Sequence, residues 1–319
     1  METKQEYWES LAAISFFLVA TGAMMLLLLA TLDLLGVEVA ADINGWGSLA
    51  ALVSAAVGGL CLMVEAGNKA KAYLIVANPA SMASRNAIMM TLTMGLAFVY
   101  ATFFFDLIPW AGLVTLRLLV AVFGIIAALL AVIIPALELG EARSRGFWHA
   151  SGLIPVFIIT SLASGMAAVL IVAVILGWGQ DPTIAIMDKV LFGLLILQLV
   201  TVLGYVKGMQ HSGASEARLA ATNILKGEFK TGFWGWVIGA GTVIPLALFV
   251  SFSPMILLIK AALILAGGVS FRIIFLAAAV RKTLPGEENQ WISREEAAHL
   301  AVRLEKRWQE KAEWLYPSK

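Results

Sequence analysis

Glu65 is the residue of this chain whose position is most suited to chemistry. It ends an apolar run, and Lys69 and Lys71 follow it closely. Asn78-Pro79-Ala80-Ser81 then forms a turn signal that also begins the next apolar run. An acid at the end of a membrane helix, facing a basic loop and a re-entering helix, lies where charge meets lipid, and a carboxyl group there can do general acid–base work. We therefore expect the reactive site here, with Lys69 and Ser81 as neighbouring polar contacts.

Further ionisable residues lie inside or at the ends of apolar runs. A charge in lipid costs at least about 2.5–3.5 kcal/mol, so each is expected to face protein or water. Arg272 lies about eight residues before the end of its run, which is too deep to reach water easily. We expect it to pair with an acid, Asp188 first and Glu65 as the alternative. Such a pair either holds helices together or, with Glu138, forms part of a proton path.

Three basic residues nearer the ends of their runs could reach the headgroups by snorkelling, because a long side chain can carry its charge to the interface. They are Arg117, Lys189 and Lys260.

The residues that are scarce in this chain exclude several kinds of site. The three histidines, His149, His211 and His299, all lie outside the apolar runs, which argues against haem and other transition-metal centres. The single cysteine, Cys61, cannot form an internal disulfide, and alone it cannot hold zinc or an iron–sulfur cluster. No glycine-rich phosphate loop or nucleophile elbow is present. We expect no bound metal, and electrons could pass only through a diffusible cofactor or a partner.

The composition is that of an integral membrane protein built from helices. Of the 319 residues, 61% are hydrophobic and only 13% are charged, about half of the usual charged fraction. Alternating strand patterns are absent, so we expect an all-α fold with eight spanning helices. The first run lacks the basic flank of a cleavable signal and is expected to remain. The eight runs are Leu11–Leu32, Gly47–Val64, Ala87–Phe105, Leu113–Leu137, Leu153–Leu176, Ala185–Val206, Phe233–Phe252 and Ile256–Val280.

The basic residues predict the orientation of these helices. With eight spans, eighteen Lys and Arg residues fall on the side of the N-terminus, whereas the other side has only Arg117, Lys189 and Lys260. Since basic loops stay in the cytoplasm, both termini are predicted to be cytoplasmic. The expected location is the cytoplasmic (inner) membrane of a bacterial type of cell. The net charge of +1 gives no indication of nucleic-acid binding.

The chain is expected to divide into a membrane domain, residues 1–282, and a polar tail, residues 283–319. Ser293 reads as the N-cap of an amphipathic helix in the tail, with Leu300, Leu304 and Trp308 at helical spacing. That helix could rest on lipid or bind a soluble partner.

A short internal echo favours two bundles of four helices. Val19-Ala-Thr-Gly22-Ala-Met in the first run is similar to Leu162-Ala-Ser-Gly165-Met-Ala in the fifth, and both place small residues where helices can approach closely.

Four stretches, in order along the chain, carry a resemblance to the NrfD/PsrC family of membrane anchors of respiratory iron–sulfur molybdoenzymes. The resemblance covers about residues 8–280. The stretches are Trp8 through Phe16-Phe17 to Gly22; Glu65-Ala-Gly…Asn78-Pro79…Ser81-Met-Ala-Ser84; Phe147-Trp148…Leu153-Ile-Pro155-Val-Phe157…Ser161…Ser164-Gly165; and Gly232-Phe-Trp234…Gly239…Pro245 followed by Phe271-Arg272.

The resemblance implies a quinone-binding anchor, with menaquinone or ubiquinone as cofactor and Glu65 exchanging the proton that accompanies quinol chemistry. Trp8, Lys69 and Ser81 are implied contacts of the quinone. An iron–sulfur subunit would dock near the ends of the first, second and fourth helices, and a third subunit, for which a molybdoenzyme is one option, would hold the substrate site. Iron–sulfur clusters would then lie in the partner alone.

Two features depart from the pattern of the family. Pro135 stands where relatives often have a tyrosine late in the fourth helix, which puts the geometry of the quinone site in doubt. Many relatives also serve partners outside the cytoplasm, whereas the Glu65 side here reads as cytoplasmic. Two other functions remain open on sequence grounds: a secondary transporter that uses Asp188 and Arg272, and a purely structural anchor.

Overall fold

The computed structural model describes residues 10–37, 39–65, 75, 78–142, 144–281 and 302–308. Trp8 and Lys69, both implied quinone contacts, lie outside these residues. The chain divides into two units, residues 1–281 and residues 282–319. Within the described residues the secondary structure is helical, without a strand, which confirms the all-α prediction.

The described helices of the first unit coincide with the expected runs, with one additional short helix, α7. They are α1 (Ser10–Leu34), α2 (Ala41–Glu65), α3 (Met82–Thr102), α4 (Val114–Gly140), α5 (Leu153–Ile175), α6 (Pro182–Gln210), α7 (Ser215–Leu225), the π-helix η2 (Gly232–Val243), α8 (Ile244–Ala247), the 3-10 turn η3 (Leu248–Val250) and α9 (Pro254–Ala277).

Seven helical segments in the described part of the chain are long and apolar enough to cross a membrane. Six of them are α1, α2, α4, α5, α6 and α9, and the seventh is the continuous stretch Gly232–Val250. The helix α3 is not among the seven, although its 21 residues are enough to span. Polar residues explain the difference, because its first turns carry Ser84, Arg85 and Asn86. The protein is therefore an integral membrane protein, and the eighth span stays a prediction.

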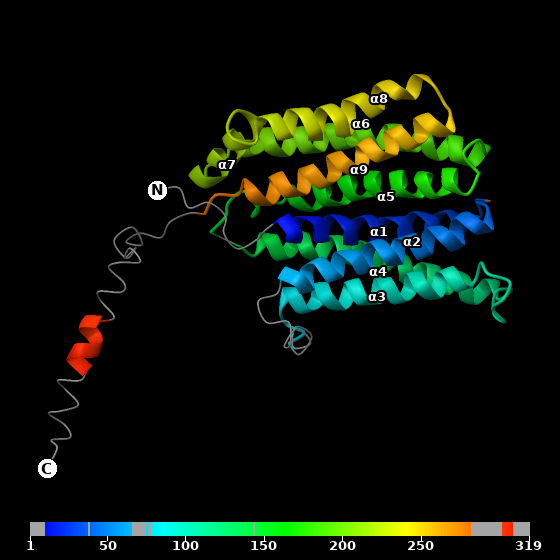
Figure 1. Cartoon of the computed structure of the whole chain (residues 1–319), viewed down its shortest axis with the longest axis horizontal. Coiled ribbons are helices and arrows are strands. Elements are labelled where there is room, and N and C mark those ends of the chain that lie inside the picture. The colour runs from blue at the N-terminus through cyan, green and yellow to red at the C-terminus, as the bar shows by residue number, and fades with distance from the viewer. Residues whose placement is uncertain are drawn as a thin grey trace, which may run out of the picture. The chain divides into compact units, whose positions relative to one another are not determined.

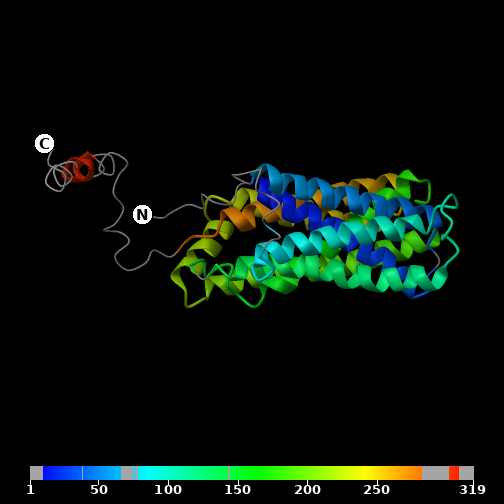
Figure 2. The ribbon, with the colours of Figure 1, turned by 90° about the horizontal axis from the view of Figure 1, so that it is seen from below.

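The long segments pack as two groups of four. The first group has contacts α1–α2, α2–α3, α3–α4 and α4–α1, and the second has α5–α6, α6–η2, η2–α9 and α9–α5. Figures 1 and 2 show these segments of the first unit lying side by side, with α7 at one end. We call one end of this unit the Glu65 end, because Glu65 lies there. It is the end at which α2, α4, α6 and α9 finish and at which α1, α3 and α5 begin. We call the opposite end, where Asp33 lies, the Asp33 end.

The helix α1 joins the two groups. It contacts α2 and α4 of its own group and α5 and α9 of the other. A side chain at Gly22 would meet the backbone carbonyl of Ala51 in α2, and one at Gly165 in α5 would lie 2.7 Å from the Cβ of Met24. The two glycines of the internal echo therefore do lie where helices approach closely, as the sequence indicated.

The seventh segment is not the regular helix that the sequence predicted. It begins as a π-helix over Gly232–Val243 and becomes α-helical at Ile244. The transition comes immediately before Pro245, whose ring nitrogen has no N–H to donate. Within the π-helix the hydroxyl of Thr242 donates to the carbonyl of Val237 at 3.0 Å. The wider turn brings Gly241 against Gly267 of α9, a contact in which neither position has room for a side chain.

In the second unit the structure describes one helical stretch, residues 302–308, with exposed side chains. It contains Leu304 and Trp308 of the predicted amphipathic helix, and both are exposed. The predicted N-cap, Ser293, lies outside the described residues.

We predict that Gly22→Ala lowers the free energy of unfolding by about 1–3 kcal/mol, because the added methyl group must displace the backbone of α2. The matched control is Gly193→Ala in α6, where the new methyl group meets no atom within 4 Å. Denaturant titration in detergent measures both variants. Equal stability of the two would contradict the close approach of α1 and α2.

Candidate functional site

The turn before α3 has the structure that its sequence predicted. The side-chain oxygen of Asn78 accepts the Ala80 N–H at 3.2 Å, and the hydroxyl of Ser81 caps α3 by accepting the Ser84 N–H at 3.2 Å. Ser84 in turn donates to the carbonyl of Ile75. Glu65 is the last residue of α2 and is half-buried. Glu65 and Ser81 thus lie at the same end of the first four-helix group.

Glu138 lies at this end as well. It belongs to the last turns of α4 and is half-buried, and the side-chain amide of Asn86 in α3 donates to its Oε2 at 3.1 Å. The amide fixes one carboxyl oxygen, so the acid is held between α3 and α4. Sequence reasoning selected Glu138 and missed Asn86, although a buried asparagine within the first turns of a membrane helix is itself a signal.

A pocket of about 610 Å³ opens where α4 ends and α5 begins. One ring nitrogen of His149, Nδ1, donates to the carbonyl of Gly140 at 2.6 Å and so ties the connecting segment to the end of α4. The pocket is lined by Met82, Ala136, Leu137, Gly140, Glu141, Trp148, His149, Ala150, Ser151, Leu153 and Ile154.

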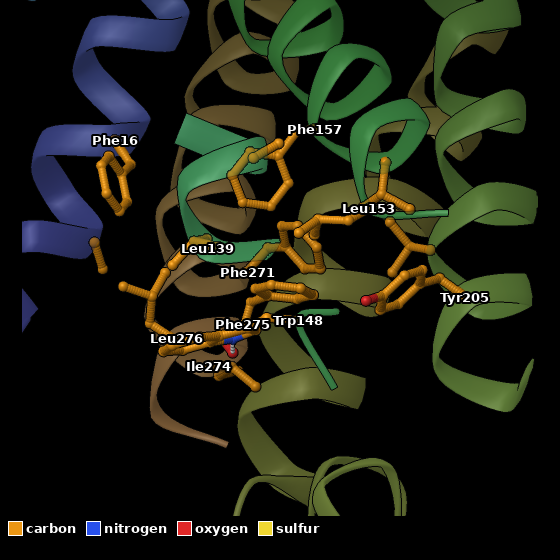
Figure 3. Packing of buried hydrophobic residues seen from close by; sticks show 14 of the residues in the cluster. Phe16, Leu139, Trp148, Leu153, Phe157, Tyr205, Phe271, Ile274, Phe275 and Leu276 are labelled. Carbon is orange, nitrogen blue, oxygen red and sulfur yellow. Dashed lines mark hydrogen bonds between the residues drawn. The ribbon is translucent and has the colours of Figure 1, made fainter. Parts of the chain in front are cut away.

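The segment that connects α4 to α5 is anchored in the core behind this pocket. The indole N–H of Trp148 donates to the carbonyl of Phe275 at 3.3 Å, and the guanidinium of Arg145 donates to the carbonyl of Ala279 at 2.9 Å. Tyr205 donates to the carbonyl of Phe147. Figure 3 shows Trp148 and Leu153 beside Tyr205 and Phe275 in one cluster of buried side chains. The inner wall is therefore a rigid part of the core.

Asp188 and Lys260 form an ion pair inside the second four-helix group. The ammonium nitrogen of Lys260 lies 2.6 and 2.7 Å from the two carboxylate oxygens of Asp188, and both side chains are buried. The ammonium also lies 3.8 Å from the centre of the Phe249 ring. The predicted pairing of Asp188 with Arg272 is thus wrong, and so is the predicted snorkelling of Lys260. Both partners lie near the starts of α6 and α9, at one depth, whereas Arg272 is near the other end of α9.

Arg272 is bound by neutral groups instead. Its Nη2 donates to the hydroxyl of Ser161 at 2.8 Å and lies 3.4 Å from the hydroxyl of Thr160, and the guanidinium stacks 3.7 Å from the centre of the Phe157 ring. Within the described residues no carboxylate pairs with Arg272, Glu65 included, and its Nη1 has no hydrogen-bond partner. The residue is 2% exposed. The same Nη2 lies 3.4 Å from the carbonyl of Phe157. Arg272 is therefore a buried cation whose described contacts are hydroxyl groups, a carbonyl and an aromatic ring.

Arg117 also has a partner that the sequence did not indicate. Its guanidinium contacts Asp33 at 2.9 Å, and the hydroxyl of Tyr100 donates to the second oxygen of that carboxylate at 3.0 Å. No spacing rule could have found this cluster, because its members come from α1, α3 and α4, up to 84 positions apart.

We predict that Asp188→Leu and Lys260→Met each lower the free energy of unfolding by about 3–5 kcal/mol, because each leaves a buried charge without its partner. The double variant is expected to be much more stable than the sum of the two losses implies, since it removes both charges. Denaturant titration of the four proteins in detergent measures the coupling energy.

Arg272→Met provides the contrast. It removes a buried charge and leaves none behind, and the hydroxyls of Thr160 and Ser161 already donate to helix carbonyls. We expect a change below about 1.5 kcal/mol, in either direction. A loss as large as that of Lys260→Met would mean that Arg272 has an anionic partner outside the described residues.

The comparison with known protein families gives one match. The family model described as polysulphide reductase, NrfD, matches residues 2–282, which includes every helix of the first unit. No curated protein matched the chain. Because the family model covers far more than half of the chain, the protein belongs to the NrfD family of membrane proteins.

Proposed function

We propose that the protein is the quinone-interacting membrane anchor subunit of a multi-subunit oxidoreductase. The observation that carries this proposal is the NrfD match across the whole helical unit, since subunits of this family are associated with polysulphide-reductase-type complexes. In this role the protein binds a quinone, menaquinone or ubiquinone, and exchanges electrons with a partner iron–sulfur subunit. A catalytic subunit, for which a molybdoenzyme is one option, completes the complex.

The quinone site is assigned to the Glu65 end of the first four-helix group. Glu65 is the proton-exchanging group, with Trp8, Lys69 and Ser81 as neighbouring contacts. Two features of the structure support this place: Glu65 is a half-buried acid at a helix end, and Glu138 is a second half-buried acid at the same end. Acids that lie partly out of water at the membrane surface are suited to passing protons between a lipid-soluble quinol and the solvent.

The iron–sulfur subunit is placed against the same end, near the start of α1 and the ends of α2 and α4. Electron transfer needs its donor and acceptor close together, so the partner belongs beside the quinone. Asp188 and Lys260 are assigned to helix association, because each charge is already satisfied by the other. This disfavours the alternative of a transporter whose substrate binds at Asp188. Arg272 keeps a proposed place on a proton path with Glu138.

All eight long segments are proposed to span the bilayer, α3 included, and both termini are placed in the cytoplasm. Reporter fusions at Lys319 and in the loop at Glu38 are expected to report opposite sides of the membrane, because eighteen basic residues lie on the side of the N-terminus. A reporter at Lys319 that is active outside the cytoplasm would reverse the orientation. Both fusions on one side would remove one of the spans from the count.

Glu65→Gln is predicted to slow quinol turnover about 100-fold or more in the complex purified from native membranes, because the amide cannot take up or release a proton. The subunits should still assemble, since the substitution keeps the shape of the side chain. The control is Glu216→Gln in α7, an acid at the same end of the unit, on a helix that contacts α6 and η2 of the second group. Unchanged turnover in the Glu65 variant would refute the role of Glu65. A subunit that purifies alone, without an iron–sulfur protein, would refute the proposed function.

A further inference from the structure

The pocket between α4 and α5 has the size and place of a small-molecule site. Its volume of about 610 Å³ falls within the range of about 300–1,000 Å³ that is typical of ligand sites. Its walls come from the last turn of α4, the segment Trp148–Ser151 and the first turn of α5, so it lies at the level where helices leave the hydrocarbon. Leu137 on its rim is exposed, which leaves the pocket open toward the surface of the helix bundle.

The polar lining of the pocket accepts hydrogen bonds. The carbonyl of Gly140 can only accept, so its contact at 2.6 Å requires the hydrogen to be on Nδ1 of His149. In the neutral ring Nε2 is then the acceptor. Glu141 and Ser151 add two more exposed groups that can accept.

The remaining lining is apolar. Met82, Leu137, Leu153 and Ile154 offer surfaces against which a flat ring and a hydrocarbon tail can pack. None of the described lining residues is lysine or arginine, and Glu141 adds negative charge. A phospholipid phosphate is therefore a poor occupant, whereas a neutral ring that donates hydroxyl groups fits the lining.

We propose that this pocket holds the headgroup of a membrane quinol, with a ring hydroxyl donating to Nε2 of His149. The inference rests on the proposed function and adds to it a defined headgroup site and a binding residue, His149. Met82, which follows Ser81 at the start of α3, links this pocket to the proposed site of proton exchange. The headgroup thus sits between elements of both four-helix groups, α4 of the first and α5 of the second.

A second hollow, on α3, provides a matched control. It has about 510 Å³ and is lined by Ile88, Thr91, Leu92, Gly95, Leu96 and Val99. Its one hydroxyl, that of Thr91, already donates to the carbonyl of Ala87 at 2.8 Å. This hollow can take an acyl chain, but it has no free acceptor nitrogen or carboxylate to orient a headgroup.

The test uses the full chain in nanodiscs of phosphatidylcholine, with binding of a short-chain quinol measured under argon by microscale thermophoresis. Ile154→Phe fills the proposed pocket, and Ile88→Phe makes the same change in the hollow on α3, where the isoleucine is also half-buried. Ile154→Phe is expected to weaken binding tenfold or more, and Ile88→Phe less than about twofold.

His149 is tested with a pair of amides. In His149→Asn the side-chain amide can take the place of Nδ1 on the Gly140 carbonyl, but nothing replaces Nε2. In His149→Gln an amide oxygen can reach the place of Nε2. We expect about tenfold weaker quinol binding for the Asn variant and near-normal binding for the Gln variant.

The outcomes separate this inference from the proposed function. If wild-type protein binds quinol and Ile154→Phe binds it equally well, the headgroup lies elsewhere at the Glu65 end, and only the present inference fails. If wild-type protein binds no quinol, both fail. If phosphatidylglycerol in the nanodisc displaces quinol from the wild type, the pocket is a lipid-headgroup site and the inference is overturned.

Discussion

The structure depends on the close approach of α1 to its neighbours. Lipid tails are as apolar as leucine, so helices in a bilayer are held together by packing and not by the exclusion of water. Gly22 and Gly165 remove the side chains that would separate α1 from α2 and from α5. Because α1 also contacts α4 and α9, these contacts join the two four-helix groups into one unit. The position of one four-helix group against the other therefore depends on α1.

Buried and half-buried charges have different kinds of partner in different parts of the unit. Two ion pairs, Asp33–Arg117 and Asp188–Lys260, lie toward the Asp33 end, one in each four-helix group. There the charges neutralise each other, and the helices gain a fixed lateral position. At the Glu65 end Glu138 is held by a neutral amide, so its charge is not cancelled by its described partner. Glu138 can therefore take up or release a proton without breaking an ion pair with Asn86, which supports our proposal of proton exchange at this end.

Local patterns in the sequence predicted the helices well and the partners of polar residues poorly. Run length and polarity located the long helical segments of the first unit, and the predicted turn at Asn78–Ser81 does precede α3, with Ser81 as the helix cap. Pairing failed because it depends on helix rotation and neighbour order, which are set by packing. Lys260 illustrates this: its place near a helix end suggested snorkelling, yet its rotation directs it into the core toward Asp188. The π-helix was missed for a similar reason, since glycines and a later proline permit it without requiring it.

The pocket at the seam between α4 and α5 differs from the other hollow in how its walls are held. Hydrogen bonds from Arg145, Trp148 and Tyr205 tie the connecting segment to α9 and α6, and His149 ties it to α4. Because such walls are already ordered, a ligand binds with little loss of conformational entropy, and weak individual contacts suffice for binding. The same bonds couple the pocket to the seam between the two groups. The contacts of a headgroup bound here would change if one four-helix group shifted against the other. A partner docked on the Glu65 end would contact both groups. Under the proposed function, the seam is therefore the place where binding of a quinone and docking of a partner would affect each other.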